Sequence, residues 1–402
     1  MNKLKVGLLK ETKNPPDRRS ALTPSTAVEM LNKFPNVELI VQSSDIRAFK
    51  DEEYTEKGLT VTDDLSDCDI LLGVKEVKQQ TFIPSKAYLF FAHVAKMQSY
   101  NKELLKTMLA KKIALIDYEY LTNTQGMRLV AFGKWAGVVG AYNGMRAWGL
   151  RSNEYSIKPA HEYHDKNEMY EHCKNVKISP IKIIITGGGR VALGAIETLN
   201  AFGIKEVTPA EILTKNYNET VFTKIEPWDY AKHKACKEFE LNHFFKNPTE
   251  YESTFEPYTK VADVYIACHF WDPKSPEFIT PEMTRKPEFK IKVVADVSCD
   301  IKKPIASTLR ASTIAEPFYD YNPETEKEEP AFSNAKNISV MAIDNLPGEL
   351  PRDASEDFSK GLIDNIFPHL FGEDKEGVIS RATIVKDGNL TEKYSYLNDW
   401  IK

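Results

Sequence analysis

The stretch "IKIIITGGGRVALGAI", residues 181–196, combines an apolar strand, a glycine turn and the start of a helix. Within it, Gly187, Gly189 and Ala192 fit the spacing G-x-G-x-x-A. Glycines let such a turn close and let the backbone approach a pyrophosphate, while the helix N-terminus presents unpaired N–H groups to negative charge. We expect the helix to end at Gly203. The pattern predicts a dinucleotide-binding turn, and the alternative is a tight strand–helix turn without a ligand.

One element of a dinucleotide site is harder to find. An acidic residue that holds the ribose hydroxyls is expected about 20 positions after the turn. The next short strand, "KEVT", ends at Thr208, and Glu206 and Glu211 flank it. Neither carboxylate stands at the end of that strand, so the sequence leaves the choice between NAD and NADP open.

Two side chains that can move protons follow apolar strands. Lys75 ends "DILLGVK" and His93 ends the apolar part of "AYLFFAHV". Ligands of parallel sheets bind beyond the carboxyl ends of the strands. A poorly solvated lysine near other cations has a lowered pKa, which suits a base, and histidine side chains titrate near neutral pH. On sequence alone, a residue of either kind is more often a capping or core residue.

Two arginines follow the first predicted strand, in "RRSALTP". The planar fork of an arginine suits bidentate binding of a carboxylate. We assign this role to Arg19 and leave Arg18 at the surface. The alternative for Arg19 is a solvated surface side chain.

The elements around these residues predict an α/β protein. The first 130 or so residues alternate apolar strand-length runs with helical patterns, which is typical of a mostly parallel, doubly wound sheet. A helix is expected from Thr23 as N-cap and Pro24 in the first turn. Residues 130–151, rich in Gly and Ala, predict a long, closely packed helix that leads out of the first domain, and the polar stretch 153–180 is expected to be a connector.

A second α/β domain begins at the strand before the glycine turn, and "VADVYIACHF" and "IKVVADVSCD" have the pattern of buried strands. The last 60 or so residues are expected to be helical and to fold back onto the first domain. The fold class is therefore α/β, with two doubly wound, Rossmann-like domains and a cleft between them. We predict a discontinuous substrate domain of residues 1–135 plus 345–402, and a dinucleotide-binding domain of residues 136–344.

Composition excludes several function classes. The 402 residues carry a net charge of −5 without a lysine-rich run, which argues against nucleic-acid or anionic-membrane partners. No stretch reaches the roughly 18 apolar residues of a bilayer span. The five cysteines are scattered, odd in number and without a CxxC pair, which favours a cytoplasmic location. The "HEYH" stretch fails the zinc-protease spacing, so we expect no metal.

Several segments together resemble a known family. They lie in family order, cover most of the chain, and read "KETKNPPDRRSALTP", "LLGVKEV", "FFAHVAKMQ", "YEYLTNTQGMRLVAFGKWAGVVGA", "GGGRVALGAI", "VVADVSCD", "STIAEPFY" and "SVMAIDNLPGELPRDASEDF". The chain resembles saccharopine dehydrogenases, of the lysine-forming type or the lysine–ketoglutarate reductase domain, within the alanine dehydrogenase and transhydrogenase α-subunit superfamily.

The resemblance implies an NAD- or NADP-dependent oxidoreductase acting on a CH–NH donor, which interconverts saccharopine with L-lysine and 2-oxoglutarate. It assigns Lys75 as base and His93 as acid. It places the substrate beside Arg19, Gln98, Arg128, Phe132, Ser298, Cys299 and Asp300. It places the cofactor beside Gly187, Gly189, Arg190, Phe270, Val297, Ile343, Asp344, Asn345 and Leu346. Lys96 and Gln98 could orient the acid–base pair or bind substrate.

Some of these roles have alternatives. Arg128 could form a buried salt bridge at a helix terminus, and Asp344 could cap the helix that follows it. Met127 stands where the lysine-forming enzymes usually have a further arginine, so one cofactor contact could be lost. A cysteine of their glycine turn is Val191 here, which excludes a link to Cys268.

Two other functions remain open. An amino-acid dehydrogenase of the alanine type would share the equivalents of Arg19, Lys75 and His93, but its smaller substrate would not need Arg128. A non-catalytic, transhydrogenase α-type NAD-binding subunit would need neither Lys75 nor His93. The sequence does not decide the direction of the reaction, the true substrate, or whether the protein is a monomer or a homodimer.

Overall fold

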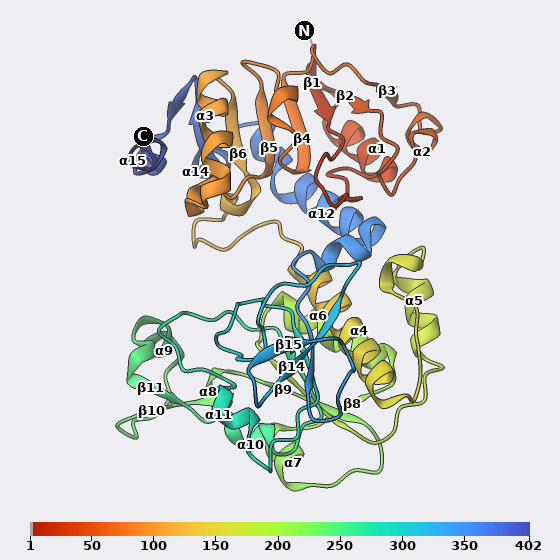
Figure 1. Cartoon of the computed structure of the whole chain (residues 1–402). Coiled ribbons are helices and arrows are strands. Elements are labelled where there is room, and N and C mark those ends of the chain that lie inside the picture. The colour runs from red at the N-terminus through yellow and green to blue at the C-terminus, as the bar shows by residue number, and fades with distance from the viewer. Residues whose placement is uncertain (1–2) are drawn as a thin grey trace. The chain divides into compact units, whose positions relative to one another are not determined.

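The computed structural model describes residues 3–402 and divides into two compact units. The first unit consists of the described residues through Phe132 together with Pro351–Lys402, and the second unit is Gly133–Leu350. The colours in Figure 1 show that the first unit joins the beginning and the end of the chain. Within residues 3–402, none of the helices has both the length and the apolar character needed to cross a lipid bilayer.

The first unit is built on an eight-stranded sheet whose core strands are parallel. Strand β17 adds antiparallel to β6, so the C-terminal segment contributes strands as well as the predicted helices. Across the sheet the order is β18 (Asn389–Leu390), β17 (Thr383–Lys386), β6 (Ala114–Asp117), β5 (Ala87–Phe91), β4 (Ile70–Lys75), β1 (Leu4–Leu8), β2 (Val37–Gln42) and β3 (Thr60–Thr62).

Apolar side chains of this sheet alternate between two cores because successive residues of a strand point to opposite faces. Leu72 and Leu89 join one cluster, whereas Leu71 and Tyr88 join the other. Helices cover both faces, as in a doubly wound fold. They are α1 (Pro24–Lys33), α2 (Asp51–Thr55), α3 (Lys102–Ala110), α12 (Pro351–Asn365), α13 (Phe367–Leu370), α14 (Val378–Ala382) and α15 (Leu397–Ile401).

The start of α1 confirms the local prediction. Thr23 is the N-cap, its side chain accepts a hydrogen bond from the Thr26 N–H, and Pro24 occupies the first turn. A cap of this kind satisfies a backbone donor that has no partner inside the helix.

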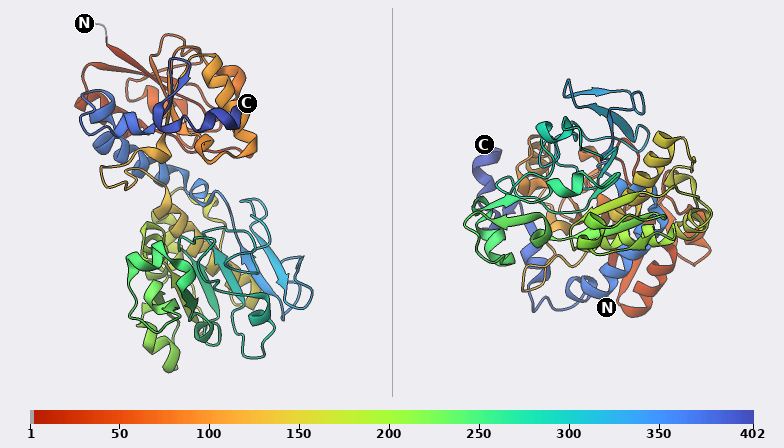
Figure 2. Two further views of the ribbon diagram at one scale, coloured as in Figure 1. Left: turned by 90° about the vertical axis from the view of Figure 1, so that its left-hand side faces the viewer. Right: turned by 90° about the horizontal axis from the view of Figure 1, so that it is seen from below.

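The second unit contains another eight-stranded sheet, and the hairpin of β14 and β15 forms one of its edges (Figure 2). The order is β15 (Lys327–Glu329), β14 (Phe318–Asn322), β16 (Ile338–Met341), β13 (Val293–Asp296), β12 (Val264–Ala267), β7 (Lys182–Thr186), β9 (Val221–Ile225) and β8 (Lys205–Glu206). A separate antiparallel pair joins β10 (Ala231–His233) to β11 (Tyr251–Ser253).

The helices of the second unit are α4 (Gly133–Ser152), α5 (Lys166–Cys173), α6 (Arg190–Ala201), α7 (Pro209–Thr214), α8 (Pro227–Tyr230), α9 (Leu241–Lys246), α10 (Glu256–Thr259) and α11 (Pro281–Thr284). Helix α5 corrects the expectation of an irregular connector over residues 153–180. Asp165 caps this helix by accepting the N–H of Glu168, a short-range signal within the polar stretch.

The long glycine-rich helix is confirmed as α4, and its glycines explain its close packing. A Cβ atom on Gly137 would lie 1.8 Å from the carbonyl oxygen of Val191 in α6. A Cβ atom on Gly194 in α6 would likewise lie 2.0 Å from the carbonyl oxygen of Lys134. The two backbones can approach this closely only because neither position carries a side chain.

Candidate active site

In the first unit, polar side chains follow the carboxyl ends of four adjacent parallel strands. Glu11 comes shortly after β1, Lys75 ends β4, His93 follows β5, and Asp117 ends β6. These strands are neighbours in the order β6, β5, β4, β1. Since parallel strands bring their carboxyl ends to one edge of the sheet, the fold gathers residues from four separate parts of the sequence.

Glu11 is a buried carboxyl group that sequence reasoning missed. Its two oxygens accept the backbone N–H groups of Val74, at 2.7 Å, and Lys75, at 2.9 Å. Burial, together with the negative charge of Asp17, raises the pKa of Glu11 to about 8. Glu11 therefore holds a proton at neutral pH. The signal that could have revealed it is the one used for Lys75 and His93, a charged residue that follows a buried strand.

Lys75 is half-buried at the end of β4. Burial lowers the pKa of its ammonium group, the positive charge of Arg19 lowers it further, and Asp17 and Glu76 oppose both effects. The sequence analysis expects a lowered pKa for Lys75, and the direction of the shift confirms this. A lysine of this kind gives up its proton more readily than an exposed one, whereas its role as a base stays a prediction.

Arg19 is buried, with 2% of its side chain exposed, so the alternative of a solvated surface arginine is wrong. Its guanidinium group forms two hydrogen bonds to Asp17, Nη2 to Oδ2 at 2.6 Å and Nε to Oδ1 at 3.0 Å. Burial opposes the charge on Asp17, but Arg19 outweighs it and lowers the pKa of Asp17 to about 2. The carboxylate held by Arg19 in this structure is therefore one of the protein's own.

The guanidinium group of Arg19 packs against a stack of two aromatic rings. Its guanidinium carbon lies 4.3 Å from the centre of the Phe132 ring, and Phe132 stacks on Phe358 with ring centres 4.5 Å apart. A cation over an aromatic face is attracted by the ring's quadrupole. Phe91 contacts both Phe132 and His93, so the aromatic side chains connect the arginine to the histidine.

His93 is held at its backbone and at its ring. Its φ of 54° lies in the left-handed region, and its N–H donates to Asp117 Oδ2 at 3.0 Å. Its ring Nδ1 lies 3.0 Å from Glu119 Oε2. An ionised carboxylate can only accept, so Nδ1 must carry the proton of this bond. In the neutral ring this leaves Nε2 with a lone pair for proton exchange.

Glu119 pairs with the ring of His93 and with two cationic side chains. Besides His93, its Oε1 pairs with Lys96 Nζ at 2.8 Å and with Arg128 Nη2 at 2.9 Å. Burial alone would raise the pKa of Glu119, but hydrogen bonds from His93 and Lys96 outweigh it and lower the pKa to about 2. Burial raises the pKa of the neighbouring Asp117 to about 6. Sequence reasoning assigned no role to either carboxylate; Asp117 ends β6 and Glu119 lies in the 3-10 helix that follows it.

Arg128 and Gln98 lie closer to solvent. The Arg128 side chain is 42% exposed and lies in a loop, so its salt bridge is neither buried nor at a helix terminus. Gln98 is exposed and its Oε1 accepts a hydrogen bond from the hydroxyl of Tyr100. Substrate binding by these two residues stays a prediction.

In the second unit, the glycine turn has the predicted form. Gly187 has a φ of +104°, and a Cβ atom there would lie 2.7 Å from the carbonyl oxygen of Cys268. Gly189 is the N-cap of α6, and a Cβ atom there would have no neighbour within 4 Å. The protein itself thus requires glycine at 187 but not at 189. A small residue at 189 instead keeps the helix N-terminus accessible to an anion.

An acidic residue that no sequence signal indicated, Glu226, lies against the glycine turn. The strand beside β7 is β9 rather than β8, and Glu226 directly follows β9. A Cβ atom on Gly188 would lie 2.4 Å from its carboxylate oxygens, which places the carboxylate against the turn. Lys224 Nζ pairs with the same carboxylate at 2.7 Å. The search near "KEVT" was wrong because β8 is the edge strand, and the residue lies farther along the chain than the usual spacing.

A cavity of about 610 Å³ opens beside the turn. Of the residues predicted for cofactor or substrate, Gly187, Gly189, Phe270, Ser298 and Asp300 line it. The complete lining consists of Gly187, Gly188, Gly189, Val191, Glu226, Pro227, Tyr230, Leu241, Phe245, Cys268, His269, Phe270, Trp271, Ser298 and Asp300. Its volume and its mixture of apolar walls with a few polar groups suit part of a dinucleotide.

Other residues predicted to bind cofactor or substrate lie outside this lining, as far as residues 3–402 show. Val297 packs against α4 at Gly140, and the Cys299 thiol donates to the carbonyl oxygen of Ala342. Arg190 is exposed at the first position of α6. Their roles stay predictions.

The "IDNL" segment combines buried and exposed residues. Ile343 and Leu346 are buried, whereas Asp344 is exposed. Asn345 is the N-cap of the short 3-10 helix that follows, so the alternative of Asp344 as a cap is wrong. Contacts of this segment with a cofactor stay a prediction.

The chain is similar in sequence to several known proteins. The family model described as "Alanine dehydrogenase/PNT, N-terminal domain" matches residues 7–139. The chain is 28% identical to an alpha-aminoadipic semialdehyde synthase of Arabidopsis thaliana, over 98% of this chain and 41% of that protein. It is also 28% identical to "Saccharopine dehydrogenase [NAD(+), L-lysine-forming]" of Yarrowia lipolytica, over 96% of this chain and 97% of that enzyme. The chain thus spans about half the length of the synthases and nearly all of the shorter relative.

Solved structures share the fold. An L-alanine dehydrogenase superposes with a TM-score of 0.68 at 15% identity, covering 99% of this chain and 100% of that one. A transhydrogenase from Sinorhizobium meliloti superposes with a TM-score of 0.56 at 15% identity, covering 96% of this chain and 98% of that one. The prediction of two Rossmann-like α/β domains is confirmed.

Proposed function

The chain is a relative of the saccharopine dehydrogenases within the alanine dehydrogenase and transhydrogenase superfamily, and from this we propose that it interconverts saccharopine with L-lysine and 2-oxoglutarate. The observation that carries the proposal is the array at the edge of the first sheet. It combines a lysine with a lowered pKa, a histidine oriented by a carboxylate, and three further cationic side chains.

The reaction removes a hydride from carbon and a proton from the secondary amine of saccharopine, which leaves an imine. Water adds to the imine carbon, the carbon–nitrogen bond breaks, lysine departs as the amine and 2-oxoglutarate keeps the carbonyl oxygen. The bound dinucleotide supplies the hydride acceptor. The protein must therefore accept the amine proton, move protons during hydration and cleavage, and hold three carboxylates.

Lys75 is suited to accept the amine proton because burial and Arg19 both disfavour its charged form. His93 is suited to the later proton transfers, since Glu119 holds the proton on Nδ1 and leaves Nε2 to exchange. Neutral Glu11 adds no negative charge beside Lys75 at neutral pH, which preserves the lowered pKa. In this proposal Lys75 is the base and His93 the acid.

The carboxylates of the substrate would bind to Arg19, Arg128 and Lys96. Asp17 holds the guanidinium group of Arg19 in place over Phe132, whereas Arg128 and Lys96 extend from Glu119 with 42% and 48% of their side chains exposed. A substrate with three carboxylates uses this number of cations better than alanine, which has one.

For the cofactor we propose NAD rather than NADP. A carboxylate at the end of the strand beside β7 accepts hydrogen bonds from ribose hydroxyls and repels a 2′-phosphate. Glu226 occupies that position against the glycine turn. Its pairing with Lys224 reduces the net charge there but leaves the carboxylate against Gly188.

The test is an assay of the purified chain with saccharopine or L-alanine and with NAD+ or NADP+, following the reduced nicotinamide. We expect turnover with saccharopine and NAD+, and formation of equal amounts of lysine and 2-oxoglutarate. Turnover of alanine but not saccharopine would favour an alanine-type dehydrogenase. Dinucleotide binding without turnover of either substrate would favour a non-catalytic binding subunit.

Two further proposals concern the cellular location and the class of binding partner. All five cysteines are free, which favours a reducing compartment, and we propose the cytoplasm. The net charge of −5 favours a small-molecule substrate over nucleic acid or an anionic membrane.

A further inference from the structure

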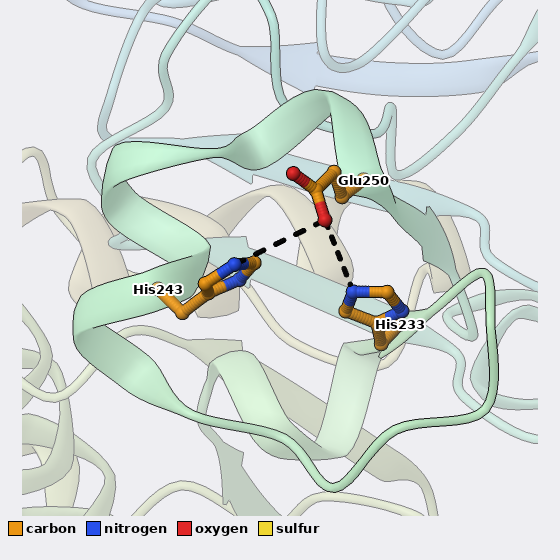
Figure 3. A group of neighbouring side chains, drawn as sticks. All are labelled: His233, His243 and Glu250. Atoms are coloured by element: carbon orange, nitrogen blue, oxygen red, sulfur yellow. Dashed lines mark hydrogen bonds and ion pairs between the residues drawn. The ribbon is translucent and has the colours of Figure 1, made fainter.

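A histidine-rich cluster lies in the segment that follows α8, apart from the residues used above. Figure 3 shows His233, His243 and Glu250 pointing toward one another. His233 ends β10, His243 lies on α9, and Glu250 ends a short 3-10 helix just before β11. Three consecutive elements thus each contribute one side chain that can bind a metal.

The geometry of the cluster is close to that of a metal site. The Glu250 Oε2 atom lies 3.2 Å from His233 Nε2 and 3.9 Å from His243 Nε2. The ligand atoms of all three residues lie within 4.8 Å of one another. Zinc bonds of about 2.0–2.2 Å in a tetrahedral site place ligand atoms roughly 3.3 Å apart. A small inward movement of His243 and Glu250 is sufficient, and neither side chain is fully buried.

Hydrogen bonds orient the ring of His243 for binding. Its Nδ1 lies 3.1 Å from the hydroxyl of buried Tyr251, and that hydroxyl donates to the carbonyl oxygen of Glu240 at 3.4 Å. The hydroxyl therefore accepts the Nδ1 proton, and the Nε2 lone pair faces Glu250. A hydrogen bond of this kind behind a ligand fixes the ring that binds a metal.

Metal binding by His233 requires a change of tautomer, because the nitrogen that faces Glu250 carries a proton. Its Nδ1 accepts the N–H of Ala235 at 3.0 Å, so its Nε2 carries the proton that faces Glu250. Metal binding at Nε2 requires that proton to move to Nδ1, which then no longer accepts the Ala235 N–H. Ala235 lies in an exposed turn, so its N–H can bond to water after this change.

We propose that His233, His243 and Glu250 bind a divalent transition metal, with Zn²⁺ as the best match, through two imidazole nitrogens and one carboxylate oxygen. Such a donor set favours zinc over magnesium or calcium, which prefer oxygen ligands. The ion fastens α9 to the β10–β11 pair. Since Leu241 and Phe245 of α9 line the 610 Å³ cavity, the site steadies one of its walls. This inference does not depend on the proposed dehydrogenase activity.

The test is titration of the full chain, first stripped with a chelator, by calorimetry with Zn²⁺ and by visible absorption with Co²⁺. We expect one ion per chain, ligand-field bands of a site with nitrogen and oxygen ligands, and no competition from excess Mg²⁺. Hydrogen exchange of residues 241–246 should slow when Zn²⁺ is added.

The variants are His243→Ala and Glu250→Gln, because both positions are partly exposed and the changes should leave the fold intact. Each should weaken Zn²⁺ binding by at least about tenfold, or about 1.4 kcal/mol. His172→Ala, in an exposed histidine of α5, and Cys236→Ser, in the exposed thiol near the cluster, are the matched controls and should bind as the unaltered protein does. Absence of saturable binding, or equal affinity in all four variants, would overturn the site. Binding without slowed exchange in α9 would overturn its fastening role.

Discussion

The most direct test of the site's electrostatics is Glu11→Gln. Folding moves the carboxyl of Glu11 out of water and beside Asp17, which raises its pKa from 4.5 to about 8. The folded protein therefore holds a proton that the unfolded chain gives up at a lower pH. Glutamine has a similar shape and no such proton equilibrium, so the substitution separates the charge from the packing.

The sign and size of the effect follow from this pKa difference. Below about pH 4.5 both states are protonated and Glu11 adds no pH dependence. Between 4.5 and about 8 only the unfolded chain has lost the proton, so the free energy of unfolding falls by about 1.4 kcal/mol per pH unit. The full effect is up to about 5 kcal/mol, and it is constant above pH 8.

The substitution also has a cost that does not vary with pH. An amide nitrogen cannot accept the N–H of Val74 or Lys75, so one backbone donor loses its partner, which costs about 1–3 kcal/mol. We therefore expect the variant to be less stable than the unaltered protein at pH 5 and more stable at pH 9, with a crossing point near pH 6.

The assay is urea denaturation at a series of pH values, read by hydrogen exchange of β4 peptides. Tryptophan fluorescence is unsuitable because it would report mainly on the second unit. Only Trp400 belongs to the first unit, whereas the other four tryptophans belong to the second. The control is Glu38→Gln, which changes an exposed carboxyl on β2. Its free energy of unfolding should not cross that of the unaltered protein as the pH changes. The reasoning is refuted if the free energies of unfolding of Glu11→Gln and of the unaltered protein differ by the same amount at every pH. Glu11 would then be ionised in the folded state.

Four further substitutions test function and stability. Lys75→Met should lower kcat with saccharopine by about 10²-fold or more while dinucleotide binding is kept, and unchanged turnover would remove Lys75 from the role of base. Glu226→Ser should lower the ratio of kcat/KM for NAD+ to that for NADP+ by about tenfold or more, and an unaltered ratio would show that the carboxylate does not select the cofactor. Gly187→Ala should destabilise the second unit by at least about 1–2 kcal/mol because of its positive φ and the Cys268 carbonyl. Gly189→Ala should keep thermal stability and weaken dinucleotide binding, so equal stability of both variants would contradict this account of the turn.

The carboxylates explain why sequence reasoning identified only half of the site. Lys75 and His93 stand out because a charged or titratable residue at the end of an apolar run is unusual. Asp117 ends β6 and Glu119 lies just after it, and their significance depends on their contacts with His93, Lys96 and Arg128. That information appears only when β1, β4, β5 and β6 are placed side by side.

The sequence by itself determined the local structure of this protein. The N-cap at Thr23, the buried strands, the glycine turn at 187 and the long glycine-rich helix depend on residues within one or two turns of one another, where backbone preference and side-chain periodicity act directly. The tertiary structure alone decided the pairing of His93 with Glu119 and the position of Glu226. Both depend on contacts that the chain makes only after folding, since strand order is set by burial over the whole sheet and not by spacing along the sequence.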